Sequence, residues 1–166
     1  MPPKPAADPT AKAYIYMKVV GGEIAAAAAL APKCSPLGMP PKVVGEAIQK
    51  ATNDWKGIKI FVEVMVQNRQ CTVQVLPTAA PLVLKALKEP PRDRKKEKNR
   101  LHNGNLKLDQ VIEIAKLMKP KSFSKTFKAT VKEVLGTCNS VGCTVDGKAP
   151  TAIQRDIDRG EIPVKE

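Results

Sequence analysis

The residues of this chain that could act as nucleophiles or bind a metal are four cysteines and a single histidine, His102. The cysteines stand at positions 34, 71, 138 and 143. A zinc site usually shows paired short spacings such as CxxC, and Cys138 and Cys143 are too far apart for that pattern. A catalytic thiol needs a base beside it, and His102 lies in a polar stretch. We therefore expect buried, unreactive cysteines, no metal and no cofactor. The alternative is a thiol or metal site at Cys138 and Cys143.

Phosphate-binding motifs of nucleotide enzymes are also missing from the sequence. It has no glycine-rich loop of the Walker type, and no GxGxxG follows a predicted strand. Cys138 falls on the apolar side of a predicted helix, together with Val134 and Val141, which favours a place in the core. We therefore predict that the chain is not an enzyme.

The uncharged stretch "GTCNSVG" (136–142) is unusual in so basic a chain. At about 100° per residue, Gly136, Thr137 and Ser140 fall on the helix side opposite the apolar stripe, together with Ala129. Glycine costs roughly 1 kcal/mol in a helix interior relative to alanine, which is tolerable where another backbone must come close. Hydroxyls beside it can bond the 2′-OH or phosphate groups of RNA. A tight helix–helix crossing, or a helix cap at Gly142, explains the same pattern.

The charge of the chain predicts a polyanionic partner. Its formal net charge is +12 and its pI is near 9.7. Residues 77–147 carry 15 basic and 7 acidic side chains, and residues 13–76 carry 7 and 4. The aromatic fraction of 4% argues against base stacking as the main source of affinity. Between Lys88 and Arg100 there are seven basic and three acidic residues, which suits either a loop ordered by a polyanion or a solvated linker.

Membrane insertion and secretion are not expected. No apolar run approaches the ~18–20 residues of a spanning helix. The start "MPPKPAADPT" lacks the apolar stretch of a secretory signal. We therefore expect no membrane partner and a cytosolic or nuclear protein.

The N-terminal half has the pattern of a small α/β domain over residues 13–76, after a tail at 1–12. "AYIYMKVV" (13–20) is typical of a strand, and alternating apolar residues over 55–76 predict a β-hairpin that turns at "QNRQ". Pro40 and Pro41 suit the first turn of a helix that carries Val44, Ala47, Ile48 and Ala51 on one side. The alanine run before it is compatible with a short helix or with low-complexity filler.

The C-terminal half has the pattern of an all-α domain over residues 77–147. Thr78 can cap a first helix that has Pro81 in its first turn. A long basic loop (88–105) leads to a second helix at 106–120, with an apolar stripe of Leu108, Val111, Ile112, Ala115 and Met118. The third helix runs from about 122 to 141, and its stripe contains Phe123, Phe127, Val131, Val134, Leu135, Cys138 and Val141. The tail at 148–166 suits partial helix or disorder. The fold class is thus α+β.

The stretch "KEVLGTCNSVGCTVD" (132–146) resembles the signature of the ribosomal protein L11 family, in its eukaryotic cytosolic form. The matching positions are Lys132, Val134, Gly136-Thr137, Ser140-Val141-Gly142 and Val145-Asp146. Further similar stretches are "VGGE", "ATNDWKG", "VQNRQ", "LVLKALKEP" and "HNGN". The resemblance covers about residues 13 to 148.

The resemblance implies a structural constituent of the large ribosomal subunit with two domains. The helical domain would bind large-subunit rRNA at the GTPase-associated centre, at the base of the stalk. The N-terminal domain would lie near an acidic stalk-base ribosomal protein and the translational GTPases (elongation factors), whose function in elongation it would support. The protein would work in cytoplasmic ribosomes, after nucleolar passage during assembly.

The resemblance also implies roles for particular residues. Those expected to bind rRNA are Lys85, Lys88, Arg92, Arg94, Lys95, Lys96, Asn103, Gly104, Asn105, Gly136, Thr137, Ser140 and Gly142. Pro32 and Pro36 would face translation factors. Two positions depart from the family pattern: Cys34-Ser35 replaces Ile-Gly, which puts the local turn in question, and Pro81 replaces an alanine near a helix start. A rival hypothesis is a general basic nucleic-acid binder that works through the charged loop alone.

Overall fold

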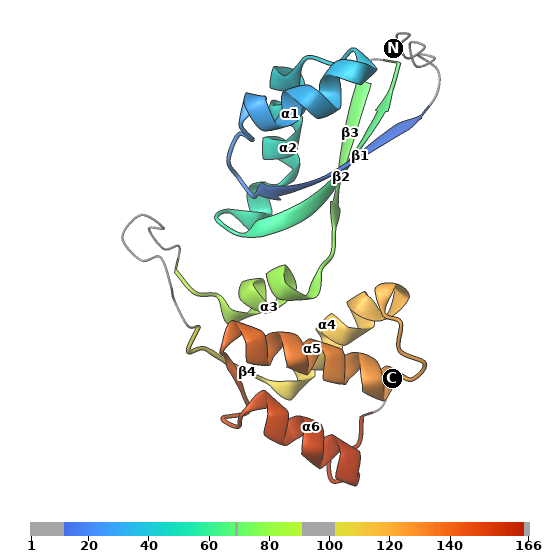
Figure 1. Cartoon of the computed structure of the whole chain (residues 1–166). Coiled ribbons are helices and arrows are strands. Elements are labelled where there is room, and N and C mark those ends of the chain that lie inside the picture. The colour runs from blue at the N-terminus through green and yellow to red at the C-terminus, as the bar shows by residue number, and fades with distance from the viewer. Residues whose placement is uncertain (1–11, 69, 91–101, 165–166) are drawn as a thin grey trace. The chain divides into compact units, whose positions relative to one another are not determined.

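The computed structural model describes residues 12–68, 70–90 and 102–164, and the chain divides into two compact units between Leu76 and Pro77 (Figure 1). None of the helices found in those ranges combines the length and the apolar character needed to cross a membrane. Each unit has its own buried apolar core.

The N-terminal unit contains a three-stranded antiparallel sheet. Its strands, in spatial order, are β1 (Ala13–Val20), β2 (Lys59–Gln67) and β3 (Gln70–Leu76). In the register, Val62 lies between Met17 on β1 and Val75 on β3. Because side chains alternate along a strand, one face collects the apolar residues. Those buried on it are Ile15, Met17, Val19, Ile60, Val62, Val64 and Val66. The predicted strand and hairpin are therefore confirmed.

Two helices cover that apolar face (Figure 1). They are α1 (Ala27–Cys34) and α2 (Pro41–Ala51), joined through a 3₁₀ turn at Ser35–Leu37, and a second 3₁₀ turn follows at Asn53–Trp55. Helix α1 decides the open question about the alanine run in favour of a helix. Pro41 occupies the first turn of α2, and Val44 and Ile48 are fully buried, as their spacing predicted. Ala51, at the end of α2, is exposed.

The described part of the C-terminal unit contains four α-helices, one 3₁₀ turn and one pair of very short strands. They are α3 (Ala79–Leu87), β4 (Asn105–Leu106), α4 (Leu108–Met118), a 3₁₀ turn at Lys119–Lys121, α5 (Phe127–Val141), β5 (Thr144–Val145) and α6 (Pro150–Arg159). Helix α5 packs against α3, α4 and α6 and is the centre of the unit (Figure 1). Strands β4 and β5 pair in parallel, and the sequence pattern predicted neither.

The start of α5 differs from the prediction. The helix begins at Phe127 instead of 122, and Phe123, expected on its apolar stripe, is fully exposed. The Ser124 hydroxyl lies 2.7 Å from the Ser122 hydroxyl and 2.6 Å from the Thr130 hydroxyl, and the Thr130 hydroxyl also donates to the Ser122 hydroxyl at 3.4 Å. These side-chain hydrogen bonds compete with helical hydrogen bonding before Phe127. Thr126 then caps the helix by accepting the N–H of Ala129.

Smaller differences concern the first two helices of this unit. Thr78 precedes α3 as predicted, but its side chain makes no capping hydrogen bond. Pro81 is buried in the first turn of α3. In α4 the sequence stripe included Val111 and Ala115, which are buried, but missed Ile114, which is also buried.

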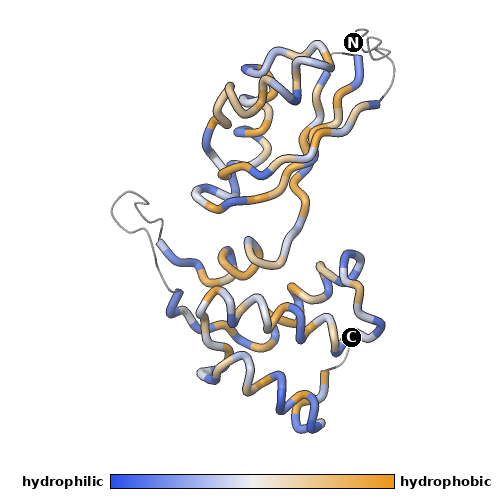
Figure 2. The backbone as a smooth tube through the Cα atoms, viewed as in Figure 1, coloured by the Kyte–Doolittle hydropathy of each residue, from blue (hydrophilic) through white to orange (hydrophobic). Residues whose placement is uncertain are grey.

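The helical unit continues past residue 147, where the sequence pattern suggested its end. Helix α6 buries Pro150, Ile153 and Ile157 in the common core. Figure 2 shows hydrophilic residues along much of α6, interrupted by a few hydrophobic positions. Because so few apolar positions are present, periodicity alone did not decide between partial helix and disorder.

Candidate nucleic-acid interface

The C-terminal half of α5 presents a strip of small side chains to solvent. Gly136 and Ser140 are exposed and Thr137 is half-buried, whereas Leu135 and Cys138 on the other side are fully buried. Outside the nearby backbone of α5 itself, a Cβ built on Gly136 would come within 4 Å of one atom among the described residues, the Gln154 Nε2 on α6, at an ordinary contact distance of 3.8 Å. Internal packing therefore does not require a glycine at this position, and the helix-crossing explanation loses its support there.

Gly142 has a structural explanation. Its φ of 94° is left-handed, and its N–H donates to the Cys138 carbonyl at 3.0 Å. The N–H of Cys143 donates to the same carbonyl at 3.2 Å. This arrangement is a helix cap that favours glycine. The capping alternative therefore accounts for Gly142 without a ligand.

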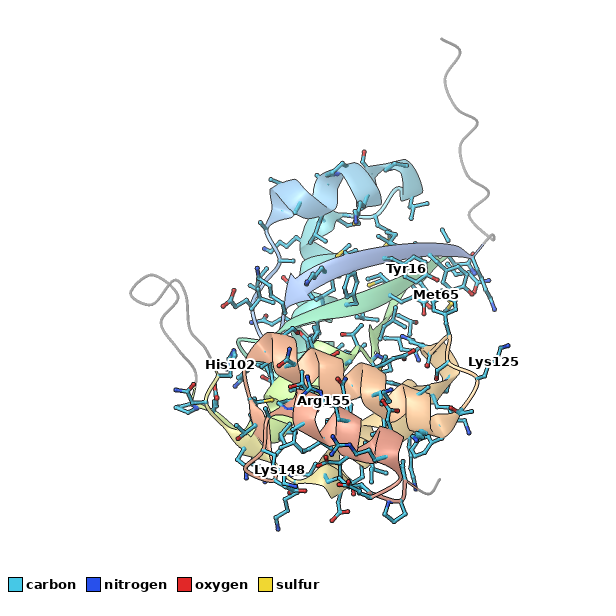
Figure 3. The ribbon with its side chains drawn as sticks, turned by 60° about the horizontal axis from the view of Figure 1, so that its bottom comes forward. Tyr16, Met65, His102, Lys125, Lys148 and Arg155 are labelled. Carbon is cyan, nitrogen blue, oxygen red and sulfur yellow. The ribbon has the colours of Figure 1, made fainter. Side chains whose placement is uncertain are left out.

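The segment 102–105 is joined to the end of α5. The His102 N–H donates to the Val141 carbonyl at 3.4 Å, and the Thr144 N–H donates to the Gly104 carbonyl at 3.0 Å. Asn105 pairs with Thr144 in the parallel ladder. In Figure 3, His102 accordingly lies at the C-terminal end of α5, and Lys125 lies at the opposite end. Two stretches separated in sequence thus meet at one end of the helix.

The three predicted residues of this segment have different environments. Asn103 is exposed. Gly104 packs closely inside the unit, because a Cβ there would lie 2.5 Å from Leu87 Cδ2 and the leucine side chain would have to shift. The Asn105 Oδ1 accepts the N–H of Gly147 at 2.9 Å and the Thr144 hydroxyl at 3.1 Å. Asn105 thereby holds the turn at Asp146 and Gly147, whose φ angles are positive. Asn103 is the one of the three whose side chain has no such internal role in the described structure.

The hydroxyls of the strip are oriented by the helix itself. The Thr137 Oγ1 donates to the Glu133 carbonyl at 3.2 Å, and the Ser140 Oγ donates to the Thr137 carbonyl at 2.8 Å. Each hydroxyl oxygen keeps lone pairs that can accept a further hydrogen bond. The strip can therefore accept a 2′-OH without losing its internal bonds.

Predicted basic residues also lie in the helical unit. Lys85 is in the last turn of α3, and Lys88 follows it with a left-handed φ of 51°; both are exposed. The other predicted cations, Arg92, Arg94, Lys95 and Lys96, lie outside the described residues.

Lys132, the basic residue of the signature stretch, is bonded to helix α6, and sequence reasoning missed this interaction. Lys132 pairs with Asp158 at 2.8 Å, and the hydrogen bond from Lys132 lowers the pKa of that carboxyl group. The Gln154 Nε2 donates to the Lys132 carbonyl at 2.8 Å. Figure 3 shows Arg155 on α6 and Lys148 in the turn before it. Lys132 is therefore engaged with α6 and less available for phosphate.

The predicted factor-facing prolines are both exposed in the N-terminal unit. Pro32 lies inside α1 and Pro36 in the 3₁₀ turn that follows it. Cys34, at the departure from the family pattern, is fully buried in the core of this unit, and its burial raises the pKa of the thiol. The turn itself is made at Gly38, with a φ of 65°.

Cys138 and Cys143 are brought together, but inside the core. Both are buried, and desolvation raises the pKa of Cys138 to about 12. The Cys143 thiol donates to the Cys138 carbonyl at 3.4 Å. No group of three or more His, Cys, Asp or Glu side chains able to hold a metal ion occurs in the part of the chain that the structure describes. These surroundings suit core thiols better than a metal site or a nucleophile.

We expect Cys138 to resist alkylation in the folded protein. With a pKa of about 12, only about one part in 10⁴ of this thiol ionises at pH 8, and the thiolate is the reactive form. Treatment with iodoacetamide at pH 8 followed by peptide mass spectrometry should leave Cys138 unmodified, whereas the urea-unfolded chain is modified fully. Rapid native labelling, or a stoichiometric metal lost from a Cys138→Ala/Cys143→Ala variant, would contradict this assignment.

Comparison with known proteins agrees with the division of the chain into two units. Residues 15–71 match the family model described as "Ribosomal protein L11, N-terminal domain", and residues 75–145 match "Ribosomal protein L11, RNA binding domain". The chain belongs to the ribosomal protein L11 family. It is similar in sequence to the "Large ribosomal subunit protein uL11" of Neurospora crassa, with 57% identity over 166 residues, 100% of this chain and 99% of that protein.

Two further L11-family relatives are similar to this chain over nearly the full length of both proteins. The "Large ribosomal subunit protein uL11A" of Schizosaccharomyces pombe is 56% identical over 164 residues, covering 99% of this chain and 98% of that protein. The corresponding protein of Saccharomyces cerevisiae is 55% identical over 166 residues, covering 100% and 99%. The match to the L11 RNA-binding domain runs from the last residues of β3 to the end of β5, so it contains the strip on α5 and excludes α6.

Proposed function

We propose that this protein is a structural, non-catalytic constituent of the large ribosomal subunit that binds large-subunit rRNA through the C-terminal end of α5. The observation that carries the proposal is the strip of Gly136, Thr137 and Ser140 on the solvent side of α5, where packing within the described structure does not require the glycine at 136. It lies within the match to an RNA-binding domain, and the relatives are named as proteins of the large ribosomal subunit.

Two physical effects would combine in binding. Lysines and arginines displace counterions from phosphate groups, which gives affinity that falls as salt rises. The strip on α5 and the adjoining Asn103 then select a folded RNA whose backbone fits against them, since RNA is often recognised by shape and 2′-OH contacts. Lys85 and Lys88, on the exposed surface at the end of α3, would supply part of the first effect.

The finer proposal concerns the place of the protein on the ribosome. We propose that the rRNA site is the GTPase-associated centre at the stalk base. There the N-terminal unit would approach the acidic stalk-base protein and the elongation factors through Pro32 and Pro36. Support comes from the exposure of both prolines and from the match of residues 15–71 to the N-terminal domain of the family. The protein would act in cytoplasmic ribosomes, with nucleolar passage during assembly.

A salt titration tests the rRNA proposal. The full chain is titrated against the large-subunit rRNA segment and against an unrelated RNA duplex of equal length, at several salt concentrations. Each neutralised phosphate contributes about 0.7–0.9 to the slope of log K on log salt, so both RNAs should show salt dependence. We expect the rRNA segment to keep an advantage of at least about 100-fold at every salt concentration, in line with specific nucleic-acid binding. Equal affinity for both RNAs would favour the general basic binder instead.

A further inference from the structure

Glu89 and His102 form a short hydrogen bond between the end of α3 and the segment that leads into β4. The His102 Nδ1 lies 2.5 Å from the Glu89 Oε2. The two side chains are only 22% and 19% exposed, so the bond is partly shielded from water. A charge-assisted hydrogen bond in such surroundings is stronger than an exposed ion pair.

This pair lies where three parts of the candidate interface meet. On one side, Leu87 and the Glu89 Oε1 pack against Gly104, where a Cβ would meet them at 2.5 Å and 3.4 Å. On the other side, the backbone N–H of His102 reaches the Val141 carbonyl at the C-terminal end of α5. The pair therefore connects the end of α3 to the end of α5 through the segment that carries the rRNA-facing residues.

The exposed Asn103 lies between these two anchored positions. Its predecessor, His102, is held by Glu89 and Val141, and its successor, Gly104, is held by Leu87 and by the Thr144 N–H. A short segment fixed on both sides loses less conformational entropy when it binds than a free one does. The exposed end of α5 and Asn103 can therefore be presented to RNA as one prepared surface.

We infer that Glu89 and His102 are a positioning pair for the rRNA-binding surface and that they fix the 102–104 segment against the end of α5. The inference rests on the proposed function, because the surface it positions is the one proposed to bind rRNA. Neither residue touches RNA in this role. Glu89 in particular is a carboxylate, which phosphate would repel.

Because Glu89 is negatively charged, the loss of its charge and the loss of its positioning role predict opposite changes in RNA affinity. Glu89→Leu removes a negative charge from an anion-binding surface, and charge alone would strengthen RNA binding. Loss of positioning weakens it instead. We expect the rRNA affinity of Glu89→Leu to fall about tenfold, with the salt slope nearly unchanged because no phosphate contact is removed. Glu89→Gln keeps an oxygen acceptor for the His102 N–H and should restore most of the affinity.

The control is Glu113→Leu, which removes an exposed carboxylate from α4. It should leave rRNA affinity unchanged or slightly raised. His102→Leu should weaken rRNA binding at least as much as Glu89→Leu, because it leaves the Glu89 carboxylate in place, and the double variant should be no weaker than His102→Leu, because both lose the same bond. Affinity of Glu89→Leu equal to or above wild type, or an equal loss on the unrelated duplex, would overturn the inference.

Hydrogen exchange measured on the full chain without RNA separates this inference from the proposed function. The His102 amide, bonded to the Val141 carbonyl, should exchange at least about tenfold faster in Glu89→Leu and at the wild-type rate in Glu89→Gln. Unchanged exchange in Glu89→Leu would overturn the positioning role whatever the RNA results are. Failure of the wild-type chain to prefer the rRNA segment, with the exchange effect present, would overturn the proposed function alone.

Discussion

Gly136→Val should fold as stably as the wild-type chain and bind the large-subunit rRNA segment about 1–3 kcal/mol more weakly. The described structure leaves room for the new Cβ, whose nearest neighbour outside the nearby backbone of α5 is the Gln154 amide at 3.8 Å. Valine is also a slightly better helix former than glycine, so the free energy of unfolding should not fall. The two branched methyl groups would instead stand between the helix and an approaching RNA backbone.

Ala80→Val is the matched control for this change. Ala80 is exposed on α3 of the same unit, so the variant adds similar bulk to a helix surface away from the strip. Titration of both variants against the rRNA segment, with urea unfolding in parallel, should show an affinity loss for Gly136→Val alone. Wild-type affinity in Gly136→Val, together with abolished binding when the lysines and arginines of 92–98 are changed to glutamine, would instead support a binder that uses the charged loop only.

Phe127→Ala should cost about 3–5 kcal/mol in the free energy of unfolding of the helical unit, whereas Phe123→Ala should cost less than about 0.5 kcal/mol. Phe127 is 8% exposed in the core, and the Lys119 ammonium group lies 5.8 Å from its ring centroid. Phe123 is fully exposed, so its truncation removes no buried apolar surface. The two substitutions remove the same atoms, four residues apart in sequence.

Urea denaturation followed by circular dichroism at 222 nm measures the free energy of unfolding of both variants. The N-terminal unit provides an internal reference, because Trp55 fluorescence reports its unfolding. The midpoint reported by Trp55 should stay unchanged in both variants. A loss for Phe123→Ala comparable with that for Phe127→Ala would mean that the helix begins near 122, with Phe123 in the core.

Local sequence pattern determined much of the fold of this protein. Alternation with period two placed the strands of the N-terminal sheet, and a period near 3.6 placed the buried side of α2 and of α5 from Phe127 onward. It also placed Gly136 and Ser140 on the exposed side of α5. These predictions succeeded because they depend on geometry within one element, which a single stretch of sequence specifies.

Tertiary structure decided the rest. The pairing of β4 with β5, which brings Asn103 to the end of α5, depends on contacts between residues about 40 positions apart. Helix α6 is ordered by burial of Ile153 and Ile157 against the other helices, and its Asp158 engages Lys132. Phe123 lies outside the buried stripe of α5, because hydrogen bonds between neighbouring hydroxyl groups replace helical hydrogen bonds around it. Such outcomes depend on which neighbours the folded chain supplies, and periodicity within one element carries no information about those neighbours.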